Sequence, residues 1–365
     1  MGMILGNGFF VFVVLLFVTV GFKLCFAQNP TAMYVFGDSL VDVGNNNYLK
    51  LSIAKADFPH NGLDFSTHKP TGRFSNGKNA ADFLAEKVGL ASSPPPYLSL
   101  KNSKPKVGSA FPITGVSFAS GGAGIFNSTD LVYKQSIPFT LQVGYFGVVY
   151  QDLVKQMGSN ATQQHLSKAL FTIIIGSNDI FGYSGDVAKN MSPQQYVDKM
   201  NSDFEGLLKR LYGLGARKFI IAGVGKVGCC PAQRVQNNTG GCLEGHNTMA
   251  LQFNQGLKSM LQNLKSQLTD INYSYLEVYS VFESFLQTPS VYGFNETKAA
   301  CCGLGNLNAQ IPCVPISIYC ANRNDHLFWD LYHPTEKAAR ILIDVFFQGM
   351  DPMVIPMNVN KLIGL

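Results

Sequence analysis

The chain has 365 residues, 46% of them hydrophobic and 14% charged, a composition that supports one sizeable core and excludes a disordered protein. Lys and Arg number 28 against 23 Asp and Glu, a net charge of +5 without a clustered basic run. This diffuse balance does not indicate nucleic acid or an anionic membrane as a partner.

An uncharged apolar run from Phe9 to Phe22 begins the chain and is too short to span a bilayer comfortably. Cys25-Phe26-Ala27 follows it, which predicts a secretory signal over residues 1–27 with cleavage after Ala27. A membrane anchor is the alternative, since the charged segment of a signal is weak here, with only Lys23 nearby. We expect one mature domain over residues 28–365, located outside the cell and without stable membrane insertion. The sequence does not specify its oligomeric state, and a monomer is the simplest expectation.

Cysteine usage also indicates export, because Cys25 leaves with the signal and the other seven cysteines form two clusters. The clusters are Cys229, Cys230, Cys242 and Cys301, Cys302, Cys313, Cys320. Their spacing suggests disulfides that staple loops, in a connectivity that the sequence leaves open. Neither cluster has the paired Cys or neighbouring His of a zinc site, so we expect no metal. Seven is odd, so one thiol should stay free or pair between chains.

The chain contains six Asn-X-Ser/Thr sequons, which in an exported protein predict glycosylation. The sequon at Asn190 is doubtful because Pro193 follows Ser192. The expected glycosylation sites are Asn127, Asn160, Asn237, Asn272 and Asn295.

The first predicted strand, Met33 to Phe36, ends in Gly37, and Ser39 follows two residues later. A buried strand delivers a hydroxyl to the rim of a sheet in this way. Residues 57–77 form a long irregular stretch, and loops of that length inside a compact domain usually build a site.

Strands and helices then alternate along the chain. The predicted strands cover residues 115–120, 171–175, 217–222 and 273–278, and the predicted helices cover 79–88, 139–157, 196–211, 249–268 and 335–347. We expect Pro334 to start the last helix. Alternation of this kind predicts an α/β fold with a parallel sheet covered on both faces.

Three of the predicted strands end in polar turns that contain glycine. These turns are Gly37-Asp38-Ser39, Gly121-Gly122 and Gly176-Ser177-Asn178-Asp179. Each alone is most simply a turn, but loops at the carboxyl ends of parallel strands converge on one crevice. We therefore expect them to border one site, with Asp38 as a hydrogen-bond acceptor that fixes its loop.

A carboxylate and an imidazole occur three residues apart near the C-terminus, at Asp330 and His333. In a turn, Asp330 can hold one ring nitrogen while the other faces a serine. An Asp-x-x-His pair alone is more often a surface Asp and a capping His. His326 is the nearest competitor as a base, but Asp325 precedes it directly and is expected to be too close along the chain to orient it comparably.

Residues 223–228 match the G-x-G-x-x-G pattern of dinucleotide-binding proteins. The cysteines and the Asn/Gly-rich loop that follow leave no helix whose N-terminus could meet a pyrophosphate. We therefore expect no cofactor.

Together these segments resemble the GDSL-type esterases/lipases of plants, within the SGNH hydrolase superfamily. The similar blocks are 36–46, 117–124, 176–179 and 330–335, with 71–77 and 300–303 as further segments. Ser117 stands where the family usually has asparagine. The resemblance extends over nearly the whole mature chain.

The resemblance implies a flavodoxin-like three-layer α/β/α sandwich around a central parallel sheet, with Ser39 as nucleophile, His333 as base and Asp330 as its orienter. It also implies an oxyanion hole formed by the Ser39 N–H, a glycine N–H and the Asn178 amide. A glycine permits close backbone approach, and we favour Gly122, although the sequence does not separate it from its neighbour.

The expected function is that of a secreted serine esterase/lipase that hydrolyses carboxylic esters through an acyl-enzyme, with an ester or lipid-like substrate. Transfer of the acyl group to an alcohol is one alternative. An exported binding or defence protein without turnover is another. The blocks do not specify the natural acyl and alcohol groups.

Overall fold

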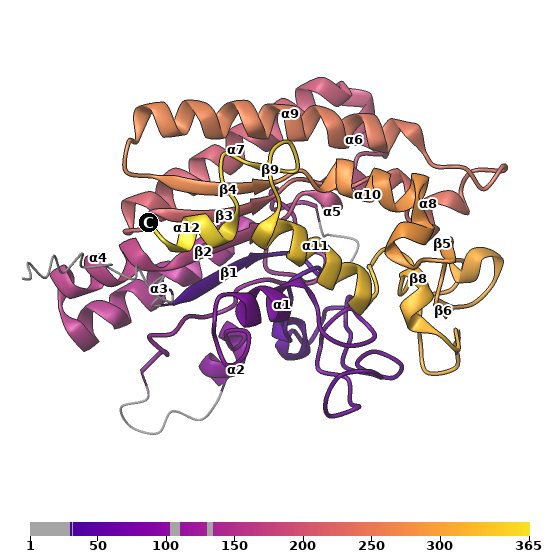
Figure 1. Ribbon diagram of the computed structural model, residues 1–365, viewed down its shortest axis with the longest axis horizontal. Helices are drawn as coiled ribbons and strands as arrows, with labels where there is room; N and C mark the ends of the chain where they lie inside the picture. Colours follow the sequence, from indigo (N-terminus) through magenta and orange to yellow (C-terminus); the bar gives the residue numbers. More distant parts are fainter. Residues whose placement is uncertain (1–29, 31, 103–109, 130–133) are drawn as a thin grey trace, which may run out of the picture.

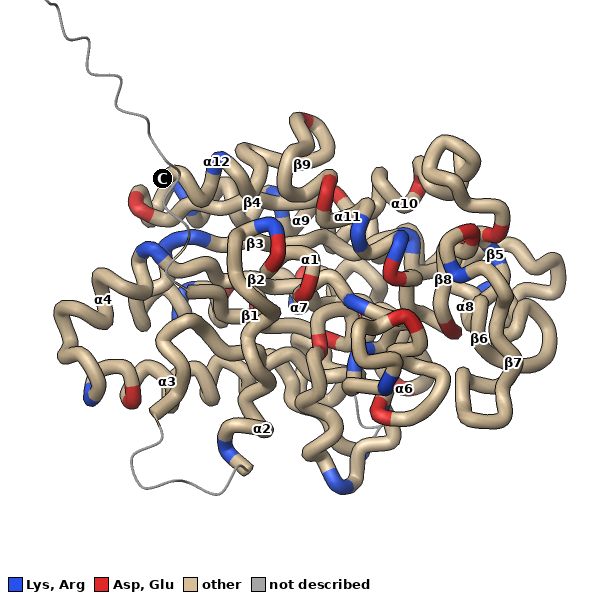
Figure 2. Tube along the Cα trace, turned by 60° about the horizontal axis from the view of Figure 1, so that its bottom comes forward, with Lys and Arg blue, Asp and Glu red and all other residues tan. Residues whose placement is uncertain are grey.

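The computed structural model describes residues 30, 32–102, 110–129 and 134–365 (Figure 1). The predicted signal, residues 1–27, lies outside the described residues. Among those described, no helix has the length and apolar character needed to cross a bilayer. Lys and Arg are interspersed with Asp and Glu in the view of Figure 2, which agrees with the diffuse charge of the sequence.

A five-stranded sheet lies at the centre of the fold. In spatial order its strands are β1 (Met33–Gly37), β2 (Leu170–Ile174), β3 (Lys218–Ala222), β4 (Asn272–Leu276) and β9 (Val354–Ile355). The first four are parallel, and β9 adds an antiparallel edge that the sequence analysis did not predict.

The segment predicted as a strand over residues 115–120 forms only isolated parallel bridges through Ser117, one to Val35 of β1 and one to Pro96. Its outer neighbour contains Pro95 and Pro96, which have no N–H to extend a ladder. This segment and the four parallel strands can be numbered by their order along the chain. Across the sheet they then lie in the order second, first, third, fourth and fifth. This order confirms the flavodoxin-like fold.

Strand side chains alternate between two apolar clusters, one on each face of the sheet. Tyr34 and Phe36 belong to one cluster, and Met33 and Val35 to the other. The first face is covered by α3 (Phe139–Met157), α7 (Pro193–Gly213) and α9 (Glu244–Gln267). The second is covered by α1 (Ala80–Lys87), α10 (Val278–Gln287), α11 (Glu336–Gln348) and α12 (Val359–Ile363). Burial on both faces explains the continuous apolar runs in the strands and confirms the three-layer architecture.

The predicted helix bounds differ from the observed ones mainly at N-termini. The prediction that Pro334 starts the last helix was wrong, because Thr335 is the N-cap and accepts a hydrogen bond from the Ala338 N–H. Pro334 instead forms an antiparallel bridge with Phe328. The shorter helices are α2 (Tyr97–Asn102), α4 (Ser159–Lys168), α5 (Ser177–Phe181), α6 (Gly185–Asn190) and α8 (Pro231–Arg234).

The second cysteine cluster organises two small sheets, which pair β5 (Glu296–Ala300) with β8 (His326–Phe328) and β6 (Cys302–Gly303) with β7 (Ile318–Tyr319). Among the cysteines that the structure describes, the disulfides are Cys229–Cys242, Cys301–Cys320 and Cys302–Cys313, and the free thiol is the buried Cys230. This pairing confirms the predicted loop staples.

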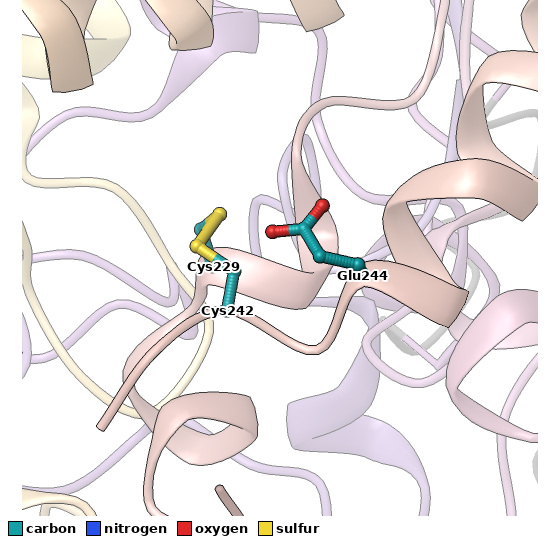
Figure 3. A group of neighbouring side chains, drawn as sticks. All are labelled: Cys229, Cys242 and Glu244. Atoms are coloured by element: carbon teal, nitrogen blue, oxygen red, sulfur yellow. A yellow bond between two sulfur atoms is a disulfide. The ribbon is translucent and has the colours of Figure 1, made fainter. Parts of the chain in front are cut away.

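One disulfide lies beside a carboxylate, in a group formed by Cys229, Cys242 and Glu244 (Figure 3). The two sulfur atoms are bonded to each other, so they are not thiolates that could ligate a metal. The group is therefore explained as a disulfide beside an acidic residue.

Candidate active site

The turn that carries Ser39 is held by contacts at the end of β1. Gly37 has φ of +154°, and a Cβ at this position would lie 2.3 Å from the Ile174 carbonyl oxygen, so glycine is required. The buried Gln142 of α3 accepts from the Gly37 N–H at 2.9 Å and donates to the Gly37 carbonyl at 2.8 Å. These bonds fix the backbone two residues before Ser39.

The structure brings Ser39, His333 and Asp330 together as a continuous hydrogen-bonded chain. Ser39 Oγ lies 2.7 Å from His333 Nε2, and His333 Nδ1 lies 2.7 and 2.8 Å from the two carboxylate oxygens of Asp330. All three residues are at most 9% exposed. The turn between Asp330 and His333 is closed by the Trp329 N–H, which donates to the His333 carbonyl at 2.8 Å.

The environment of Asp330 favours its ionised form. Burial alone raises the pKa of this carboxyl, but the charge of His333 and hydrogen bonds from His333 and the Tyr332 backbone outweigh it, so the pKa lies below its usual value. An ionised Asp330 only accepts hydrogen bonds, which places the imidazole hydrogen on Nδ1. His333 Nε2 is then free to accept the Ser39 proton.

Phe74, in the long loop before α1, packs beside the imidazole, with its ring centroid 5.0 Å from that of His333. The same ring lies against Gly121, where a Cβ would approach Phe74 Cζ to 2.5 Å. Residues 71–77 are one of the segments that resemble the family and belong to the long loop expected to build a site, but the sequence pattern predicted no role for Phe74.

The two neighbouring glycines of the second turn differ in their hydrogen bonding. The Gly121 N–H donates to Asp42 Oδ2 at 3.0 Å, so it is already engaged. Gly122 has φ of +81° and borders the cavity that also contains Ser39 and His333. This difference separates two residues that the sequence could not distinguish.

Asn178 lies in the first turn of α5 and borders the same cavity. Its Nδ2 donates to the Ala123 carbonyl at 2.9 Å, which uses one of the two amide hydrogens. Asp179 ties α5 to the loop beyond Ala123, because it accepts from the backbone N–H groups of Ile125 and Phe126.

Asp38 lies next to the nucleophile candidate and is 1% exposed. Its Oδ1 accepts from the Leu40 N–H at 3.0 Å, as expected of a residue that fixes the loop, while its Oδ2 has no hydrogen-bond partner. Burial raises the pKa of Asp38 to about 7, against hydrogen bonding and the charge of His333, which lower it.

His326, the competing base, does contact the preceding carboxylate: its Nδ1 lies 2.6 Å from Asp325 Oδ1. The expectation that Asp325 is too close along the chain to orient it was therefore wrong. His326 nevertheless lies on β8 and does not border the cavity.

The glycine-rich segment 223–227 borders the cavity but leads into a short 3-10 helix, Val227–Cys229, and then the four-residue α8. The long helix of a dinucleotide site is absent at this position in the described chain. Asn127, Asn160 and Asn295 are exposed, whereas Asn237 and Asn272 are half-buried. Glycosylation at all five stays a prediction.

A cavity of about 410 Å³ extends from Ser39 and His333 into the apolar interior. A hydrogen-bonded Ser-His-Asp set at the carboxyl edge of a parallel sheet, open to such a cavity, is the arrangement of a serine hydrolase. The chain belongs to the GDSL-like lipase/acylhydrolase family, whose model matches residues 33–346.

Two curated proteins of Arabidopsis thaliana, each named a GDSL esterase/lipase, are similar over most of their length. One is 47% identical over 338 residues, which cover 91% of this chain and 89% of the relative. The other is 37% identical over 322 residues, which cover 87% of this chain and 88% of the relative. The protein is therefore a carboxylic ester hydrolase of the serine type.

Among solved structures, a catalytic mutant of an acetylxylan esterase from Geobacillus stearothermophilus is 12% identical and covers 86% of this chain and 90% of its own. Its TM-score is 0.35.

Proposed function

We propose that Ser39 is the nucleophile and that hydrolysis proceeds through an acyl-enzyme. His333 Nε2 takes the hydroxyl proton as Ser39 Oγ attacks the ester carbonyl, and it then gives this proton to the departing alcohol. Asp330 keeps the imidazole in the required tautomer and stabilises its protonated form. Water then attacks the acyl group on Ser39, with His333 again acting as the base, and the carboxylic acid is released. The observation that carries this proposal is the unbroken chain of bonds from Asp330 through His333 to Ser39.

The developing oxyanion is stabilised by the backbone N–H groups of Ser39 and Gly122 and by the Asn178 amide. Support for Gly122 comes from the engagement of the Gly121 N–H with Asp42. Support for Asn178 comes from its uncommitted amide hydrogen beside the cavity. These donors act on charge that develops only during attack, which is where hydrogen bonds lower a barrier most.

We also propose that the protein is exported, with residues 1–27 as a cleaved signal and residues 28–365 as one mature, glycosylated domain outside the cell. The three disulfides support this location, because such bonds persist in oxidising compartments. The substrate is an ester or lipid-like molecule.

Replacement of Ser39 or His333 tests the catalytic proposal. Ser39→Ala and His333→Ala should each abolish hydrolysis of p-nitrophenyl acetate, and Ser39→Ala should no longer react with a fluorophosphonate probe. Ser266→Ala, an exposed serine on α9, is the matched control and should keep both properties. Full activity in folded Ser39→Ala protein would contradict the proposal.

A further inference from the structure

The cavity beside Ser39 has an inner part that ends inside the second apolar cluster. Its floor is formed by Ile174, Ala222 and Leu276, the last residues of β2, β3 and β4. Phe282 of α10 and Ile343 of α11 close it from the helix side. These five residues are between 2% and 9% exposed and have no polar side-chain atom. The inner part is therefore a closed apolar end.

The outer part of the same cavity is different in exposure and chemistry. It is bordered by Ile53, which is 61% exposed, and by the polar side chains of Lys55 and Asn61. Pro312 and Val314 of the disulfide-stapled region border it as well. Solvent reaches this part, so polar groups can enter and leave there with their hydrogen bonds satisfied.

The order of the two chemical steps decides which half of an ester suits each part. The acyl group stays bonded to Ser39 until deacylation, whereas the alcohol must leave first and water must then enter. A closed end would trap an alcohol and block the approach of water, but it can hold an acyl chain during both chemical steps. It also disfavours polar groups, because the side chains of these five residues offer them no hydrogen bond.

We propose that the inner part binds the acyl chain of the substrate, and that Ala222 and Ile343 limit the length of that chain. The proposal rests on the role of Ser39 as nucleophile given above. It makes the enzyme selective for esters of medium to long fatty acids, while the alcohol faces the polar outer part.

Hydrolysis of p-nitrophenyl esters from acetate to dodecanoate tests this assignment. For wild-type protein, kcat/KM should rise by up to about fourfold for each methylene that the cavity buries. Ala222→Leu fills the floor and should lower the ratio of dodecanoate to acetate hydrolysis by about tenfold or more. Ile343→Ala should shift the preference toward longer chains.

Ile220→Ala is the matched control, because Ile220 is buried in the same cluster on β3 but does not line the cavity. This variant should keep the wild-type chain-length profile despite its loss of stability. An unchanged profile in both Ala222→Leu and Ile343→Ala would overturn the proposal, and if the former does not fold, the latter decides alone. If these two variants change only the hydrolysis of acetate esters of long-chain alcohols, the alcohol binds in the inner part. That result would also overturn the proposal.

Binding separates this proposal from the proposed catalysis. Ser39→Ala protein should bind dodecanoate in a calorimetric titration, and Ala222→Leu in that background should weaken binding by about tenfold. Absence of dodecanoate binding overturns the acyl-chain assignment even if short esters are hydrolysed. Failure of the fluorophosphonate to label Ser39, with dodecanoate binding intact, refutes the nucleophile and leaves the binding site supported.

Discussion

Gln142 is a buried amide that connects α3 to the strand end beneath Ser39. Besides its two bonds to Gly37, its Nε2 donates to the Ile137 carbonyl at 2.7 Å, and the residue is 0% exposed. Gln142→Met keeps the size of the side chain but removes these bonds. The Gly37 carbonyl retains the Ser120 N–H as donor, so two groups are left without a partner, the Gly37 N–H and the Ile137 carbonyl.

Each buried group that loses its partner costs about 1–3 kcal/mol, so Gln142→Met should lower the free energy of unfolding by about 2–6 kcal/mol. For a chain of this size the corresponding fall in Tm is about 3–9 °C. We also expect a lower kcat, because the backbone that positions Ser39 is no longer held. Thermal unfolding and p-nitrophenyl acetate hydrolysis measure the two effects.

Gln151→Met is the matched control, because Gln151 lies on the exposed side of the same helix and its replacement should change the stability by no more than about 0.5 kcal/mol. Equal melting temperatures for Gln142→Met and Gln151→Met would show that the buried amide contributes nothing to stability, and equal kcat values would refute its effect on Ser39.

Three further predictions concern the oxyanion site, a buried acid and a disulfide. Asn178→Ala should lower kcat by about 10²–10³-fold with little effect on KM, measured by steady-state kinetics, whereas the exposed Asn263→Ala should not. The raised pKa of Asp38, about 7, means that the folded protein binds a proton that the unfolded chain loses above its usual pKa of 3.8. The contribution of Asp38 to stability is therefore present at low pH and is lost as the pH rises from about 4 to 7, by up to about 4 kcal/mol. Denaturant titrations should show Asp38→Asn gaining stability relative to wild type over that interval, and a constant difference would contradict the burial argument. Replacement of both Cys229 and Cys242 by Ala should cost about 3 kcal/mol in a denaturant titration, because it frees a short loop; unchanged stability would show that this disulfide does not constrain the unfolded chain.

The order and type of the main elements were predictable because the local patterns were strong. The predicted helix over residues 139–157 has the observed bounds, Phe139–Met157, and the four parallel strands lie within one or two residues of their predicted ends. The helices bury one face and show a clear apolar period, whereas the strands are buried on both faces and read as continuous apolar runs.

The burial of Gln142 could have been predicted from its position in the sequence. It lies four residues before Phe146, and so on the same buried face of α3. A polar residue at a core position of a helix requires a partner, and that requirement points to a nearby strand end. The partner itself, Gly37, is 105 residues away and could not be identified from the helix pattern.

Other features had no local signal of sufficient strength. β9 has only two residues, and its antiparallel pairing depends on the chain path after α11. The connectivity of the second cysteine cluster depends on which sulfur atoms the two small sheets bring together. Distances along the chain do not specify those contacts.

The chemical groups of the candidate site could be named from the sequence alone, because a serine after a strand, an Asp-x-x-His turn and glycine-containing strand ends are local patterns. The α/β class could also be predicted, since helices with one buried face show an apolar period and strands buried on both faces read as continuous apolar runs. Tertiary structure decided that Ser39 Oγ lies 2.7 Å from His333 Nε2 and that the Gly121 N–H is engaged with Asp42. It also created the cavity, whose walls come from strands and helices far apart in the chain. Such features arise from long-range packing, which residue periodicity along the chain does not encode.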